Sequence, residues 1–195
     1  MIFVSFLLIL WILLLVLLKR KNMAFFLFAA GSIGMFLLLM YMGTGTIESY
    51  LGYGVTYIMY IFGKVTGMIS AYPGYLSVTV NYKLQAVSFF IDYECSGIIE
   101  TLVYICLLSF YPLYSWRMKG FLAAAGAFYI FAANVARIFV ICSIVKLFGP
   151  AAFFISHTVI ARFLFFILTV ILYYIVFTKP HILKQKVGEP AGGNR

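Results

Sequence analysis

Residues 2–18 read IFVSFLLILWILLLVLL, an apolar run long enough to cross a bilayer as one helix. The basic cluster Lys19, Arg20 and Lys21 follows it at once. A cleavable signal peptide carries its positive charge before the apolar run and ends in small residues. Because this segment does neither, we expect a retained membrane span whose N-terminal end lies outside the cell.

The composition of the whole chain indicates the same class of protein. Of its 195 residues, 65% are hydrophobic and 10% are charged, and the mean hydropathy is +1.10. A soluble domain carries about 25% charged residues, so this chain lacks the polar surface that a globule in water needs. The sequence therefore predicts an all-α polytopic membrane protein in contact with the lipid bilayer.

The apolar runs predict five to six transmembrane helices within a single membrane domain, residues 1–178. Residues 50–70 contain several glycines and Lys64, and Gly63-x-x-x-Gly67 would allow close packing on a neighbour. This segment is interpreted as an interfacial or re-entrant helix, with a full span as the alternative. The remaining spans are expected at about 2–18, 23–42, 97–115, 120–147 and 152–178.

One segment does not resemble a membrane helix. From Leu76 to Ala86, apolar and polar residues alternate after the turn signal Pro73-Gly74, and a period of two is typical of a β-strand. An open strand cannot lie in lipid with unpaired backbone groups. We therefore predict a small extracytoplasmic β element over residues 71–94, with a bulge or turn where the alternation slips at Ala86-Val87.

Basic residues indicate the orientation of the predicted spans. Most of them fall on one side, which the positive-inside rule assigns to the cytoplasm together with the basic tail, residues 179–195. These residues are Lys19, Arg20, Lys21, Arg117, Lys119, Lys179, Lys184, Lys186 and Arg195. The β element and the starts of the 97–115 and 152–178 spans then share the outer face of the plasma membrane. The net charge of +9 is interpreted as a topology signal, so no nucleic-acid partner is expected.

The cysteines differ in their surroundings. Cys95 lies where the β segment meets a predicted helix start near Ser96 or Gly97, and a helix N-terminus favours the thiolate form. The alternative is a small residue at a tight turn. Cys106 and Cys142 lie inside apolar runs and are interpreted as packing residues, and the three cysteines show no metal-binding spacing.

Polar residues inside membrane spans are costly, so each needs a reason. Asn134 and Arg137 are three residues apart and share one helix face. A buried arginine lines a polar cavity or pairs with a carboxylate, so the alternative to a functional role is an ion pair with Glu94 or Glu100. His157 lies about one turn into the last span, where a structural role is the alternative.

The predicted topology brings a cysteine, an arginine and a histidine toward the same side on three segments. Acyl transfer to a thiol needs this set of groups. The nucleophile needs a base, which His157 supplies, and the oxyanion needs a cation or donors, which Arg137 supplies with Asn134 nearby.

At these residues the sequence resembles the exosortase/archaeosortase family, in particular its shorter Gram-positive branch. The resemblance rests on Glu94-Cys95-Ser96-Gly97-Ile98, Asn134-Val135-Ala136-Arg137-Ile138 and His157, and it covers roughly residues 50–175. It implies a membrane cysteine protease or transpeptidase that cleaves the C-terminal sorting signal of an exported protein at the outer face. The acyl group would pass to water or to an amine acceptor.

By this resemblance Cys95 is the nucleophile, Arg137 the transition-state stabiliser and His157 the general base, without a metal or an organic cofactor. Glu94 is a supporting residue, and Arg162 is a possible alternative cation. Two other functions stay open. One is a non-catalytic membrane subunit of a surface-polysaccharide or export system, in which Arg137 forms a structural ion pair. The other is a channel or carrier that uses Arg137 as an anion site.

Overall fold

The computed structural model describes residues 2–42, 45–180 and 182. The chain divides into two compact units, one made of Met1–Thr44 and Ile99–Ala127, the other of Gly45–Ile98 and Phe128–Arg195. One long helix, α5, contributes its first part to the first unit and its second part to the other. Among the described residues, all the strands belong to the second unit.

The first unit is helical. Its elements are α1 (Ile2–Arg20), α2 (Ala24–Tyr41), α4 (Ile98–Phe110) from its second residue onward, and α5 (Trp116–Phe148) up to Ala127. The indole N–H of Trp11 on α1 donates to the carbonyl of Ala30 on α2 at 2.9 Å. Small residues make such contacts possible, because a side chain at Gly34 would collide with the Trp11 ring. On the other two helices, the Tyr104 hydroxyl donates to the carbonyl of Leu122 at 2.8 Å.

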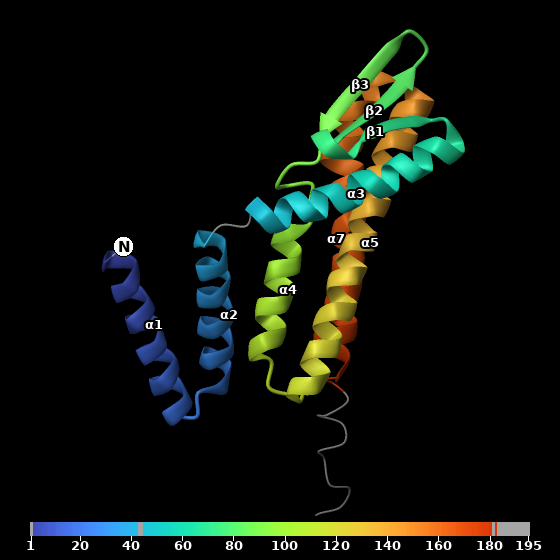
Figure 1. The fold of residues 1–195 in the computed structure, drawn as a ribbon. Helices are drawn as coiled ribbons and strands as arrows, with labels where there is room; N and C mark the ends of the chain where they lie inside the picture. The colour runs from blue at the N-terminus through green and yellow to red at the C-terminus, as the bar shows by residue number, and fades with distance from the viewer. Residues whose placement is uncertain (1, 43–44, 181, 183–195) are drawn as a thin grey trace, which may run out of the picture. The chain divides into compact units, whose positions relative to one another are not determined.

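The second unit combines a small sheet with helices (Figure 1). It begins with α3 (Gly45–Thr66), continues with the sheet, and ends with the second part of α5 and a continuous helical run. The strands are β1 (Ile69–Tyr72), β2 (Ser77–Tyr82) and β3 (Gln85–Phe90), with the turn η1 (Pro73–Tyr75) before β2. The helical run comprises η2 (Pro150–Ala152), α6 (Phe153–Ile155), η3 (Ser156–Ile160), α7 (Ala161–Tyr173) and η4 (Tyr174–Thr178).

The sheet has the order β1-β2-β3, and both neighbouring pairs are antiparallel. Val78, Val80 and Phe89 are buried on one face, as the period of two requires. The predicted β element is therefore present. The position predicted for its turn is wrong, because the chain reverses three residues earlier, at Lys83-Leu84, and Ala86 pairs with Asn81. The sequence pattern did not reveal this turn, because Leu84 is apolar although it is fully exposed at the hairpin tip.

α3 is amphipathic rather than apolar all round. Its buried residues recur at helical spacing and face the sheet, while Tyr50, Tyr53 and Tyr57 are exposed. Gly63 packs directly against the backbone oxygen of Ile69 in β1. The close packing predicted for the glycine pair thus involves a strand, and Gly67 follows the end of the helix with a left-handed φ of 64°.

By length and composition, three helices of the described residues can cross a membrane: α2, α5 and the run Pro150–Thr178. α4 is apolar but ends at Phe110, after 13 residues. The predicted number of five to six spans is therefore not supported, because α4 is shorter than expected and α3 is amphipathic. Most of the predicted basic tail, residues 179–195, lies outside the described residues.

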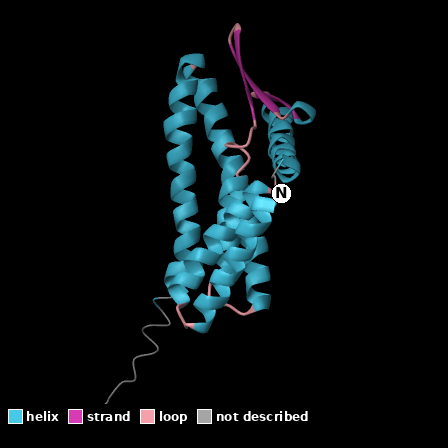
Figure 2. Cartoon of the chain, turned by 90° about the vertical axis from the view of Figure 1, so that its left-hand side faces the viewer, coloured by secondary structure: helices cyan, strands magenta, loops and turns pink. Residues whose placement is uncertain are grey.

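The core of the second unit fixes the sheet against α5. Val78 and Val80 of β2 join Ile138, Ile141 and Val145 of α5 in one buried apolar cluster. Figure 2 shows all the strands at the end of this unit where α5 turns into α6. Burial of each such side chain contributes about 1.5–3 kcal/mol, so the sheet and the segment that follows β3 are held on α5.

Candidate active site

Cys95 lies in a tight turn between β3 and α4. The backbone N–H of Cys95 donates to the carbonyl oxygen of Asp92 at 3.0 Å and to its carboxylate oxygen Oδ1 at 3.1 Å. Gly97 closes the turn with a φ of 76°, a conformation that a residue with a Cβ rarely adopts. The turn leaves Cys95 only 2% exposed.

Two side chains of α5 hold this turn by its carbonyl groups. The amide Nδ2 of Asn134 donates to the Cys95 carbonyl at 2.6 Å, and Nη1 of Arg137 donates to the Glu94 carbonyl at 3.3 Å. Asn134 is fully buried and Arg137 is 4% exposed. The spacing of three residues predicted a shared face for Asn134 and Arg137, and both now contact the same turn.

The structure brings the predicted nucleophile, base and cation together. The Sγ atom of Cys95 lies 3.3 Å from Nε2 of His157, and Nη2 of Arg137 donates toward the same sulfur at 3.8 Å. His157 lies in η3, a turn of π-helix, and such turns occur frequently at functional sites. The Phe153 ring stacks on the imidazole with 5.5 Å between the ring centroids, which fixes the plane of the His157 ring.

The environment of Cys95 favours the neutral thiol. Burial raises the pKa of Cys95 from its ordinary 9.0 to about 11, although the Arg137 guanidinium acts in the opposite direction. The expectation of a thiolate at a helix N-terminus is therefore wrong. α4 begins only at Ile98, three residues after Cys95, and desolvation outweighs the effect of the nearby cation.

Arg137 has a free donor but no carboxylate partner in the residues that the structure describes. Its guanidinium lies over the Phe165 ring at 5.6 Å, and its buried Nε atom has no hydrogen-bond partner there. The carboxylate of Glu94 instead binds Arg162, with 3.3 Å between Oε2 and Nη2. Among the described residues, the alternative in which Arg137 pairs with Glu94 or Glu100 is thus not observed.

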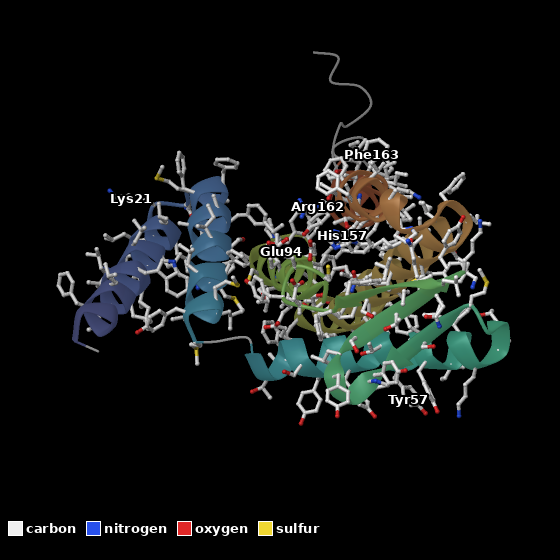
Figure 3. The ribbon with its side chains drawn as sticks, turned by 90° about the horizontal axis from the view of Figure 1, so that it is seen from above. Lys21, Tyr57, Glu94, His157, Arg162 and Phe163 are labelled. Atoms are coloured by element: carbon white, nitrogen blue, oxygen red, sulfur yellow. The ribbon has the colours of Figure 1, made fainter. Side chains whose placement is uncertain are left out.

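Glu94 and Arg162 form an exposed pair beside the buried groups. Figure 3 shows both close to His157, and their side chains are 68% and 54% exposed. An ion pair in water contributes about 0–1 kcal/mol, so this contact adds little to stability. The Glu94–Arg162 pair is relevant to the site because it lies beside Cys95 and His157. Among the described residues, Arg162 contacts Glu94 and not the sulfur, and Arg137 is the cation next to the sulfur.

Three contact residues were not predicted from the sequence. Asp92 accepts the N–H of Cys95, Phe153 stacks on His157, and Phe165 supports Arg137. Local signals existed for two of them. An aspartate three residues before Cys95 is typical of a turn in which the carboxylate accepts a backbone N–H, and Phe153 precedes His157 by one helical turn.

This geometry can support acyl transfer to a thiol. The sulfur touches a nitrogen base, and the base is oriented by an aromatic ring. In known acyl-transfer sites, the backbone N–H of the nucleophile stabilises the oxyanion. Here the N–H of Cys95 already donates to Asp92. Arg137, whose Nη2 lies 3.8 Å from the sulfur, is therefore the cation that could stabilise a negative oxygen there. In the described ranges, no group of three His, Cys, Asp or Glu side chains could hold a metal ion.

Comparison with known proteins connects this geometry to one family. The sequence model of the transmembrane exosortase family matches residues 1–174, a range that includes the Cys95 turn, α5 and η3. No curated protein and no solved structure matches the chain.

Proposed function

The chain belongs to the transmembrane exosortase family, and we propose that it is a cysteine protease or transpeptidase with Cys95 as its nucleophile. The family match and the apolar helices make it a multi-pass membrane protein with a function of this general kind. The observation that supports the proposed mechanism best is the 3.3 Å contact between Cys95 Sγ and His157 Nε2.

In the first step, Cys95 attacks a carbonyl carbon of the substrate polypeptide. Because the resting thiol is neutral, its proton passes to Nε2 of His157 as the S–C bond forms. The electron pair of the carbonyl moves onto oxygen. Arg137 stabilises that oxyanion, since its guanidinium already lies against the sulfur and keeps a buried N–H without a partner in the described part of the chain.

In the second step, the tetrahedral intermediate collapses to a thioester. The C–N bond breaks, and the leaving amine takes the proton from His157. Water or a substrate amine then attacks the thioester, gives up its proton to His157, and releases the thiol of Cys95. Hydrolysis gives a protease, and attack by an amine gives a transpeptidase.

Asn134 and the Glu94–Arg162 pair have supporting roles in this scheme. Asn134 keeps the Cys95 turn on α5 through the Cys95 carbonyl, so it positions the nucleophile. The exposed Glu94–Arg162 pair lies where a substrate would approach the buried sulfur. By the family, we propose that the substrate is an exported, membrane-anchored protein, cleaved at a C-terminal sorting signal.

We also propose that the site lies on the extracytoplasmic side. The support is the distribution of charge along the chain: basic residues end α1 and begin α5, whereas the sheet packs on the second part of α5. A cysteine at the fully exposed hairpin tip, Leu84→Cys, tests this in a chain whose three native cysteines are replaced by alanine. A membrane-impermeant maleimide should label it in intact cells.

Lys21→Cys, in the basic turn after α1, is the matched control and should react only after permeabilisation. The opposite pattern, with Lys21→Cys labelled in intact cells and Leu84→Cys protected, would place the site in the cytoplasm.

The test of the chemistry is recovery of the acyl intermediate. Membranes are dissolved in acidic denaturant, which preserves thioesters, and the protein is digested for mass spectrometry. We expect a peptide attached to Cys95 that hydroxylamine releases, and no adduct in Cys95→Ala. Cys142→Ala removes another buried thiol of the same unit and should leave the adduct unchanged. Full cellular function of Cys95→Ala would instead favour the non-catalytic membrane subunit.

A further inference from the structure

The sheet has two edges, and they differ in their surroundings. β1 forms one edge, and α3 lies along it so closely that Gly63 touches the backbone of Ile69. β3 forms the other edge and lies at the margin of the sheet opposite β1 (Figure 1). η2 lies near β3, but in the described residues no backbone hydrogen bond joins the two. Among the described residues, the β1 edge is therefore the one along which a long helix packs.

The outer edge of β3 presents backbone groups without a partner. The N–H of Ile91 donates to the carbonyl of Leu76 at 2.7 Å, which sets the alternation of the ladder. Residues of β3 with odd numbers bond to β2, so Ala86, Ser88 and Phe90 direct their N–H and C=O groups outward. Across the parts of the chain that the structure describes, these outward groups make no hydrogen bond.

This edge also lacks the features that protect natural edge strands. Charged side chains, proline and bulges normally prevent an exposed edge from pairing with another chain. β3 reads QAVSFF, without a charge or a proline, and its register with β2 is continuous from Gln85 to Phe90. The side chains of Ala86, Ser88 and Phe90 are exposed. An unprotected edge of this kind is able to accept an extended peptide.

The strand leads directly to the nucleophile. β3 ends at Phe90, and the turn that holds Cys95 begins two residues later, at Asp92. On the buried face of the same strand, the Phe89 ring contacts Phe153, which stacks on His157. The free edge and the reacting atoms are therefore parts of one continuous structure.

We propose that the outer edge of β3 binds the substrate as an added strand, so that the scissile segment is extended as it reaches Cys95. This inference rests on the proposed function, and the occupant is the substrate polypeptide itself. Main-chain hydrogen bonds to Ala86, Ser88 and Phe90 supply affinity for any extended sequence, and side-chain contacts supply selectivity. An extended segment is also the form in which a peptide bond is exposed on both sides to a nucleophile and a base.

Length dependence of labelling tests the proposal. The probes are acetyl-alanine chloromethyl ketone and acetyl-tetra-alanine chloromethyl ketone, in which the thiol displaces chloride and forms an S–C bond. The longer probe can bond to the strand edge and the shorter one cannot. Two main-chain hydrogen bonds correspond to roughly tenfold faster labelling of Cys95 by the longer probe.

Ser88→Pro removes one outward N–H and leaves the ladder with β2 intact, because proline is tolerated at such edge positions. We expect this variant to lose the tenfold advantage of the longer probe, while Ser88→Ala keeps it. Iodoacetamide, which is too small to use the edge, should label Cys95 at the same rate in both variants and the wild type. Equal rates with iodoacetamide would show that the Cys95–His157 contact is preserved in both variants.

A second measurement needs no variant. Tetra-alanine probes methylated on alternate amide nitrogens lose their hydrogen bonds on one side only, so one of the two methylated forms should lose the advantage and the other should keep it. Equal labelling by short and long probes, or an undiminished advantage in Ser88→Pro, overturns the strand-addition proposal. Neither result affects the Cys95 adduct, whose absence would overturn the proposed function instead.

Discussion

Arg137→Gln is expected to reduce processing of the natural substrate by about 10²–10³-fold, the usual cost of removing an oxyanion donor. The reason is geometric, because the Arg137 guanidinium lies 3.8 Å from Cys95 Sγ and the N–H of Cys95 is already bonded to Asp92. Glutamine retains a donor but not the charge. Arg137→Lys retains the charge but loses the planar fork, so it should recover only part of the activity.

Processing can be measured from the C-terminal peptides of membrane and surface proteins in cells that carry each variant. The pH dependence of Cys95 alkylation gives an independent readout. Arg137 lowers the pKa that burial raises to about 11, so its removal should move the alkylation profile to higher pH and slow the reaction at every pH below the inflection. An unchanged profile together with full processing would contradict the role of Arg137 at the sulfur.

His157→Ala is expected to reduce processing by about 10²–10⁴-fold, the range typical of a lost general base. A neutral buried thiol cannot attack a carbonyl unless its proton has an acceptor, and Nε2 of His157 is the atom 3.3 Å from the sulfur. Phe153 would remain as one wall of the vacated space. Imidazole added to the medium should therefore restore part of the activity.

Two controls separate a base from a merely structural histidine. Alkylation of Cys95 in strong alkali should be the same in His157→Ala and in the wild type, because hydroxide then removes the proton. The thermal unfolding of the purified variant in detergent should also stay close to that of the wild type. Loss of processing without any rescue by imidazole, accompanied by early unfolding, would mean that His157 only supports the fold.

Composition and patterning were sufficient to predict the class of protein, because the cost of exposing apolar side chains to water applies along the whole chain. An apolar run needs lipid or a core, and the alternation after Pro73-Gly74 needs a sheet. The same logic identified Asn134, Arg137 and His157, since polar groups in apolar helices need partners. The three-residue spacing of Asn134 and Arg137 predicted their common face, which the Cys95 turn now occupies.

The details that failed depend on tertiary structure. The two-residue turn shifts the core-facing positions from even numbers in β2 to odd numbers in β3. The exposed apolar residues Leu84 and Ala86 nevertheless continue the even-numbered pattern, so the sequence placed the slip after the true turn at Lys83-Leu84. Helix lengths were overestimated at α4, because an apolar sequence continues beyond Phe110 into a turn. The protonation of Cys95 depends on burial by residues far along the chain, and local sequence suggested only a nearby helix start.

The burial of Cys95 has a chemical consequence for the extracytoplasmic site that we propose. Thiolates are the species that oxidants convert to sulfenic and sulfinic acids, and exposure accelerates this damage. With 2% exposure and a pKa of about 11, the resting sulfur holds its proton and has little contact with dissolved oxidants. On the outer face that we propose, reactivity would then arise only when a bound substrate draws the proton toward His157. The same packing that slows the nucleophile at rest would keep it reduced in an oxidising environment.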